Sequence, residues 1–98
     1  MNHCSFLGKL QNIPLSLDKE EGERILIDLL VENKRNDKSL AKKTDCEVLT
    51  FEAWGSAAAN IAKNLSLNDY MLIIDSTARR NSNGVCFRIN EFKIIKQY

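Results

Sequence analysis

Residues 51–65, FEAWGSAAANIAKNL, contain the change of periodicity that decides the fold, because a strand ends here and a helix begins. In the first part of this stretch and just before it, apolar and polar residues alternate. This period of two predicts a strand over residues 46–54. Leu49, Phe51 and Ala53 share the face that we expect to be buried. The strand therefore presents one face to a hydrophobic core.

The opposite face of this strand is mixed, and we expect it to point outward; it carries Val48, Thr50, Glu52 and Trp54. This parity places Trp54 on or near the surface. Gly55 then breaks the strand, and Ser56 is expected to cap the start of a helix. Apolar residues spaced at i, i+3, i+4 and i+7 predict about three turns of amphipathic helix. These residues are Ala58, Ile61, Ala62 and Leu65.

Four further strands are expected on either side of this block, over residues 4–10, 24–32, 70–78 and 85–96. Gly8 within the first of them indicates a bend or a close approach of two backbones. The sequence NSNG at residues 81–84 predicts a hairpin turn between the last two strands. A parity change between Ile89 and Phe92 predicts a β-bulge. Residues 33–45 show no periodicity and many charges, which predicts a long flexible loop.

The resulting order is β-β-β-α-β-β within a single domain over residues 1–98. It fits an all-β protein with one helix, the OB-fold, whose five-stranded, partly open barrel carries a helix between strands three and four. A five-stranded open sheet backed by one helix is the alternative that periodicity alone leaves open.

Composition bounds the class of protein. The chain has 98 residues, of which 44% are hydrophobic and 28% charged, which suits one soluble domain with one core. No stretch approaches the ~20 apolar residues of a membrane helix. The first residues do not read as a secretory signal. Three widely spaced cysteines, without a CxxC pair, indicate buried free thiols in a reducing compartment: Cys4, Cys46 and Cys86.

The formal net charge of only +1 conceals an uneven distribution. One basic segment, residues 34–43, contains a single acid, Asp37, among its five cations, which are Lys34, Arg35, Lys38, Lys42 and Lys43. A second, residues 76–90, contains Arg79, Arg80 and Arg88 and no acid. If the fold brings the two segments together, they form a patch that attracts anions.

The residues do not indicate an enzyme. Hydrolysis or group transfer requires an activated nucleophile, a pair of carboxylates or a metal ion, and the only histidine, His3, stands beside Cys4 with no third partner. The glycines are isolated, so there is no phosphate-binding glycine loop. We therefore expect no catalytic residues, no metal and no cofactor.

Binding of single-stranded nucleic acid requires cations along the phosphates and exposed aromatic rings on which bases stack. The candidate residues for this function are Trp54, Lys34, Arg35, Lys38, Arg79, Arg80 and Arg88. The alternative interpretation is structural. Residues 34–43 are then a solvated loop, and Trp54 packs against the helix that begins beside it.

The chain also resembles the bacterial single-stranded DNA-binding proteins. Its start, MNHCSFLGKL, is similar to the opening of that family, and residues 51–65 resemble the family's most recognisable stretch, an aromatic-Gly pair followed by a helix. The segment NDYMLIIDSTARR, residues 68–80, is similar to the strand that follows. The resemblance implies an OB-fold, non-catalytic binding of single-stranded DNA and a homo-oligomer, either a dimer or a tetramer. It also implies that Trp54 stacks a base.

The chain departs from that family in two ways. Three further stacking aromatics of the family correspond to Arg35, Val48 and Asn81, so we expect weaker binding. The sequence ends at Tyr98 without the family's acidic tail; if this end is the natural one, the resemblance is to a short, tailless variant. Cyanobacterial and plastid homologues are of this kind, and the primosomal replication protein shares the fold.

Two alternatives stay open at this stage. The domain can be an assembly subunit, of the primosome or of a structural oligomer, with weak or no DNA binding. RNA can replace DNA, because stacking and phosphate contacts do not separate the two polymers. The expected location is cytoplasmic and associated with the nucleoid, or the plastid stroma if the chain is organelle-encoded.

Overall fold

The computed structural model describes residues 3–12, 15–17, 24–35, 43–81 and 84–96. Its elements in chain order are β1 (His3–Leu10), β2 (Leu15–Leu17), β3 (Arg24–Arg35), β4 (Lys43–Trp54), α1 (Gly55–Asn64), β5 (Tyr70–Asn81) and β6 (Gly84–Ile95). The five predicted strands and the helix are all present. The short strand β2 is additional, and it pairs only with β3 at the edge of the sheet.

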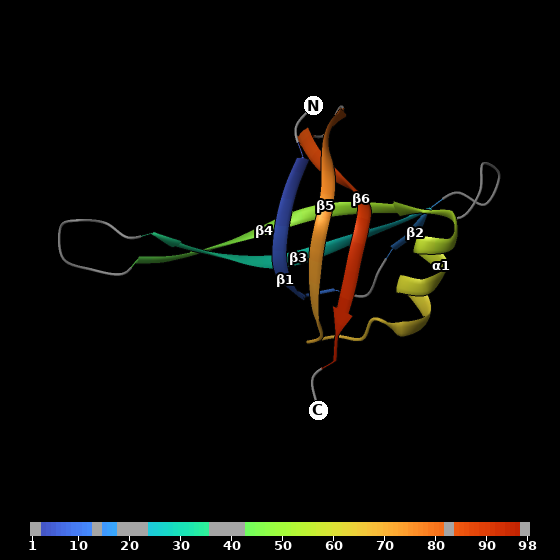
Figure 1. Ribbon diagram of the computed structural model, residues 1–98, viewed down its shortest axis with the longest axis horizontal. Coiled ribbons are helices and arrows are strands. Elements are labelled where there is room, and N and C mark those ends of the chain that lie inside the picture. Colours follow the sequence, from blue (N-terminus) through green and yellow to red (C-terminus); the bar gives the residue numbers. More distant parts are fainter. Residues whose placement is uncertain (1–2, 13–14, 18–23, 36–42, 82–83, 97–98) are drawn as a thin grey trace.

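The strands form a barrel that is only partly closed. Their order is β1-β5-β6-β4-β3-β2, and β1 also pairs with β3, so the sheet returns on itself. This return excludes the open-sheet alternative and confirms the OB-fold. The weakest seam is the parallel one between β4 and β6, where only Phe51 and Glu52 pair, with Phe87 and Arg88. Figure 1 shows α1 beside one end of the barrel, next to the ends of β3 and β4.

Strands β3 and β4 pair along their whole length, from Arg24 opposite Trp54 to Arg35 opposite Lys43. In Figure 1 their far end projects well beyond the barrel as a two-stranded arm. The predicted loop over residues 33–45 is therefore wrong at both ends, where the backbone continues as strand; residues 36–42 lie outside the described residues. Sequence periodicity misses such strands, because the backbone hydrogen bonds between two paired strands do not require an apolar face.

The core fills the barrel and confirms the predicted faces. Phe51 and Ala53 are fully buried, and Leu49 is partly buried against the same cluster. The ring of Phe51 lies 5.3 Å from that of Phe6 and 5.6 Å from that of Phe87, centroid to centroid. This aromatic group lies at the narrow β4–β6 seam, where it holds the barrel together.

Gly8 marks the close backbone approach that the sequence predicts. A Cβ atom at this position would lie 2.7 Å from the Cβ of Leu29 on β3. At Gly8, β1 pairs with Met71 of β5 on one edge and with Val31 of β3 on the other, and the pairing with β3 closes the barrel.

The helix begins two residues earlier than predicted. Gly55 is its first residue and has a φ of +59°, a left-handed conformation that favours glycine. The predicted cap by Ser56 is wrong, because the N-cap residue is Trp54 and no side chain caps the helix. Ala58 and Ile61 are buried as expected, whereas Ala62 is exposed.

The predicted hairpin and bulge are both present. Asn81 pairs with Gly84, which leaves a two-residue connection between β5 and β6. The register between β5 and β6 shifts on either side of Asp75, which lies opposite the part of β6 between Ile89 and Phe92. None of the three cysteines forms a disulfide bond, and only Cys86 is buried. Cys4 is partly buried and Cys46 is exposed, so the prediction of burial is wrong for Cys46. Among the described residues, no helix has the length and apolar character needed to cross a membrane.

Candidate nucleic-acid interface

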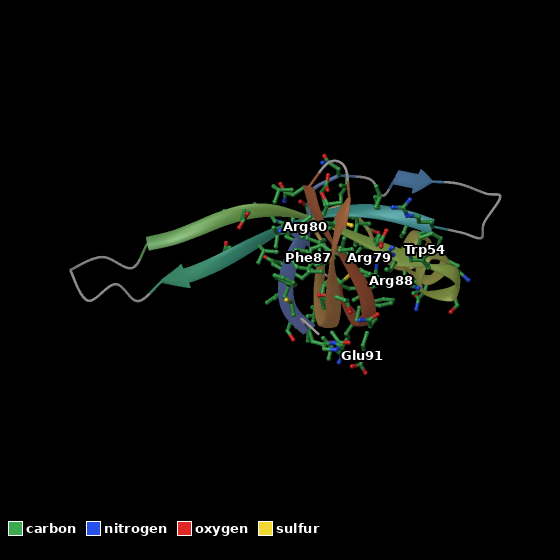
Figure 2. All side chains as sticks on the ribbon, turned by 90° about the horizontal axis from the view of Figure 1, so that it is seen from above. Trp54, Arg79, Arg80, Phe87, Arg88 and Glu91 are labelled. Atoms are coloured by element: carbon green, nitrogen blue, oxygen red, sulfur yellow. The ribbon has the colours of Figure 1, made fainter. Side chains whose placement is uncertain are left out.

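Four neighbouring strands bring five polar or aromatic side chains together on the outside of the barrel, and we call this group the arginine–tryptophan cluster. It consists of Arg24 on β3, Glu52 and Trp54 on β4, Arg79 on β5 and Arg88 on β6. The register explains the gathering, because Arg24 lies opposite Trp54 and Arg88 lies beside Glu52. Figure 2 shows Trp54, Arg79 and Arg88 on the same side of the β5–β6 ribbon.

Glu52 is the centre of the cluster. Both of its carboxylate oxygens are used: Arg24 donates from Nε and Nη2 to Oε2, at 3.2 and 2.9 Å, and Arg79 donates from Nη1 to Oε1, at 3.0 Å. The side chain is only 3% exposed. Glu52 lies on the outer face of the strand, but the expectation that it is exposed to solvent is wrong, because two guanidinium groups cover its carboxylate. Buried charge is tolerated here because it is paired and fully hydrogen-bonded.

Trp54 lies near the surface, as its parity predicts, but its ring is not bare. The Cζ atoms of Arg24 and Arg88 lie 5.2 and 5.8 Å from the ring centroid. These arginines come from the two strands that flank β4. The indole Nε1 is buried and has no hydrogen-bond partner among the described residues. A base that stacks on this ring must therefore share it with a guanidinium group or displace one.

The three arginines are held with different strengths. Arg24 makes two hydrogen bonds to Glu52 and is 28% exposed, whereas Arg79 makes one and is 49% exposed. Arg88 is exposed and has no acidic partner among the described residues; its one recorded interaction is with the ring of Trp54. A hydrogen bond to a charged group contributes about 1.5–3 kcal/mol. A cation–π contact at an exposed site contributes about 0.5–1 kcal/mol. Arg88 is thus the most weakly held of the three.

Arg80 does not join the cluster. It neighbours Arg79 on β5 but has the opposite parity, and it pairs with Val85 near the end of the hairpin. In Figure 2 it lies apart from Trp54 and Arg88. Its side chain is exposed, so it remains available to a ligand that passes the end of the β5–β6 hairpin.

The other basic segment lies at the far end of the β3–β4 hairpin. The backbones of Lys34 and Arg35 pair with Thr44 and Lys43 near the tip of the arm. The positions of their side chains, and the whole of Lys38, fall outside the described residues. The strand from Lys43 to Trp54 is about 36 Å long at ~3.3 Å per residue. The expected single patch is therefore replaced by two basic regions at opposite ends of one hairpin.

Sequence reasoning missed Arg24 and Glu52 as members of the site. Two signals were present in the pattern. A hairpin centred on residues 33–45 brings the start of β3 opposite the end of β4, and hence Arg24 opposite Trp54. A charged residue between the apolar residues of a strand, such as Glu52, is also a candidate for a buried ion pair. Neither signal identifies the arginine from β5 that completes the group.

The described residues include two further reactive groups, the thiol of Cys86 and the imidazole of His3. Burial raises the pKa of the Cys86 thiol; the nearby Glu52 carboxylate adds to this, and Arg79 and Arg24 oppose it. A raised pKa keeps this thiol protonated and poorly nucleophilic at neutral pH. His3 is exposed, and its Nδ1 lies 2.7 Å from Oδ1 of Asp75. Within the described part of the chain, no three histidine, cysteine or acidic side chains are grouped for a metal ion.

No protein-family model and no curated protein sequence matches the chain. Solved structures do. The small single-stranded DNA-binding protein of Streptomyces coelicolor superposes with a TM-score of 0.70 at 18% identity, over 96% of this chain and 93% of that one. The second single-stranded DNA-binding protein of Mycobacterium smegmatis gives 0.74 at 15% identity, over 93% and 85%.

A third match extends the comparison to a longer protein. The single-stranded DNA-binding protein of Thermus aquaticus superposes with a TM-score of 0.73 at 12% identity, over 98% of this chain and 50% of that one. At such low identities the agreement concerns the course of the backbone. The chain therefore has the OB-fold in the form found in bacterial single-stranded DNA-binding proteins, which confirms at the level of the fold the resemblance carried by residues 51–65.

Proposed function

We propose that this protein binds single-stranded DNA, largely without sequence preference and without catalysis. The observation that carries the proposal is the arginine–tryptophan cluster on the outer wall of the barrel, in which two guanidinium groups lie against an indole and a third binds the carboxylate of Glu52 beside them. The surplus of positive charge attracts phosphates, and the ring offers a surface to a base. Support also comes from the fold, because its solved neighbours are named as single-stranded DNA-binding proteins.

In this proposal Arg88, Arg79 and the neighbouring Arg80 contact phosphates, and Trp54 stacks a base. The basic segment of residues 34–43, with Lys34, Arg35 and Lys38, contacts the DNA further along. Val48, where the resemblance implies a stacking aromatic, is 53% exposed and offers no ring. Because each stacked base contributes about 1–3 kcal/mol, a single platform predicts modest affinity.

The test is a titration of the protein with oligo-dT, read through its single tryptophan. We expect Trp54 emission to be quenched, because the stacked base contacts the indole. The apparent affinity should fall steeply with salt, since phosphate neutralisation releases counterions. Double-stranded DNA of equal length is the control and should quench much less. Absence of both quenching and a gel shift at low salt contradicts the proposal.

We also propose that the protein forms a homo-oligomer through a second surface on β1, β5 and β6. This apolar surface consists of Leu7, Leu72, Ile74 and Ile95, of which all but Leu72 are at least 39% exposed. Leu7 and Leu72 are directly paired across β1 and β5. The apolar surface lies on the first half of β5, whereas the arginine–tryptophan cluster lies on its second half. A second copy can therefore cover the apolar surface and leave the cluster open.

The oligomer is tested by mass measurement in solution. Leu7→Glu places a charge in the apolar surface, and we expect it to shift the mass toward that of the monomer. Val85→Glu is the matched control, because Val85 is 54% exposed but lies at the β5–β6 hairpin. A wild-type protein that is monomeric at micromolar concentration contradicts this part of the proposal.

A second candidate function, that of a protein-assembly subunit, is favoured by two observations. The exposed apolar surface fits a protein partner, and Arg24 and Arg79 already have an anionic partner in Glu52. The two candidates differ in their response to charge reversal. Arg79→Glu together with Arg80→Glu should abolish DNA binding in the first case and leave assembly unchanged in the second.

A further inference from the structure

We infer that Arg88 occupies, in the free protein, the place on the Trp54 ring that a nucleobase takes in the complex, and that Glu52 restricts this exchange to Arg88. The inference rests on the proposed function and adds a mechanism to it. It assigns Glu52 the role of a positioning residue. It assigns Arg88 two successive partners, the indole before binding and a phosphate afterwards.

The first step of the argument is that two guanidinium groups compete with any base for the indole. The Cζ atoms of Arg24 and Arg88 lie 5.2 and 5.8 Å from the ring centroid, and the ring is partly buried. A base needs a similar approach distance to stack. A base that stacks on the part of the ring that Arg24 or Arg88 covers must therefore displace that arginine.

The second step is that Arg24 is held in place. Its Nε and Nη2 both donate to Oε2 of Glu52, and that carboxylate is 3% exposed. Departure of Arg24 would leave a buried carboxylate oxygen without its donors, which is strongly unfavourable. Arg79 cannot compensate, because it already donates to the other oxygen, Oε1.

The third step is that Arg88 is free to move. Its side chain is exposed, and among the described residues its guanidinium group interacts only with the ring of Trp54. Its strand, β6, is paired to β4 at Glu52, so the displaced guanidinium group stays beside the cluster. There it can neutralise the phosphate of the nucleotide whose base has taken its place on the indole. The exchange thus substitutes a stacked base and an ion pair for one cation–π contact.

The first experiment measures how accessible the single tryptophan is to acrylamide in the free protein. Arg88→Gln should raise the quenching constant by about twofold, because one of the two covering groups is lost. Arg80→Gln, which changes the same charge on the neighbouring strand, should leave it unchanged. An unchanged constant in Arg88→Gln overturns the inference, whatever the protein binds.

The role of Glu52 is tested in the same assay with Glu52→Gln, which preserves the shape of the side chain. Added to Arg88→Gln, it should raise the quenching constant further, because Arg24 is no longer held against the ring. Circular dichroism must show that the double variant is folded; if it is not, the less disruptive Arg24→Lys replaces Glu52→Gln. No further rise in a folded double variant overturns the positioning role.

The second experiment separates bases from phosphates. Oligo-dT should quench Trp54 emission, whereas an abasic deoxyribose-phosphate oligomer of the same length should bind without quenching, because it has nothing to stack. Equal quenching by both polymers overturns the exchange. Binding of neither polymer at low salt overturns the proposed function itself. The acrylamide assay does not depend on this outcome, because it uses the free protein.

Discussion

Arg79→Gln combined with Arg88→Gln is expected to weaken binding of oligo-dT by about a hundredfold at low salt. Each lost charge-assisted contact with a phosphate contributes about 1.5 kcal/mol, so two contribute about 3 kcal/mol, or two decades in Kd. The slope of log affinity against log salt should also fall by about 1.4, since each neutralised phosphate of a single strand contributes about 0.7. Titrations at several salt concentrations measure both quantities.

The control for this variant changes the same number of charges elsewhere. Lys63 on α1 and Lys93 on β6 are both exposed, and in the described part of the chain neither takes part in the hydrogen bonds and ion pairs of the arginine–tryptophan cluster. Lys63→Gln combined with Lys93→Gln should reduce the affinity only slightly, through the net charge. If both double variants weaken binding equally, the cluster has no special role and general electrostatic attraction explains the binding.

Phe51→Ala is expected to lower the free energy of unfolding by about 3–5 kcal/mol, because it removes a fully buried aromatic side chain. The loss should be large because the ring packs against both Phe6 and Phe87 at the two-residue seam of the barrel. A domain of this size is stable by only about 5–15 kcal/mol in total. Denaturant unfolding, followed by circular dichroism, measures the change.

Val48→Ala provides the comparison on the same strand. Val48 is 53% exposed, so its truncation should change the stability by no more than about 0.5 kcal/mol. A loss below about 1 kcal/mol for Phe51→Ala would contradict the packing of the barrel, because a cavity of this size removes many contacts from a close-packed core.

The fold was predictable from local patterns wherever one face of an element is buried. The alternation in residues 46–54 correctly separates buried Phe51 and Ala53 from the opposite face, and Gly8 correctly predicts the close approach of β1 and β3. The arm was not predictable. Residues 33–35 and 43–45 continue the strands, but their sequences, NKR and KTD, are polar throughout and lack the periodicity by which a strand is recognised.

The candidate site was predictable in its residue types and less so in its arrangement. Parity correctly placed Trp54 near the surface, and the basic segment around Arg79 and Arg88 does reach it. Parity also placed Glu52 in solvent, and the structure buries it. The reason is that burial on an outer face depends on long side chains from neighbouring strands, which are distant in the sequence.

By itself, the sequence determined the strands and the helix, the place of glycine at two tight positions, and a supply of cations with one tryptophan. These properties depend on neighbours along the chain. Only the tertiary structure decided which cations meet the indole, because β-sheet register joins Arg24, Glu52, Arg79 and Arg88 from four strands. It also decided that a carboxylate holds two of these arginines and leaves the third free, since that depends on distances of a few ångströms between residues far apart in sequence.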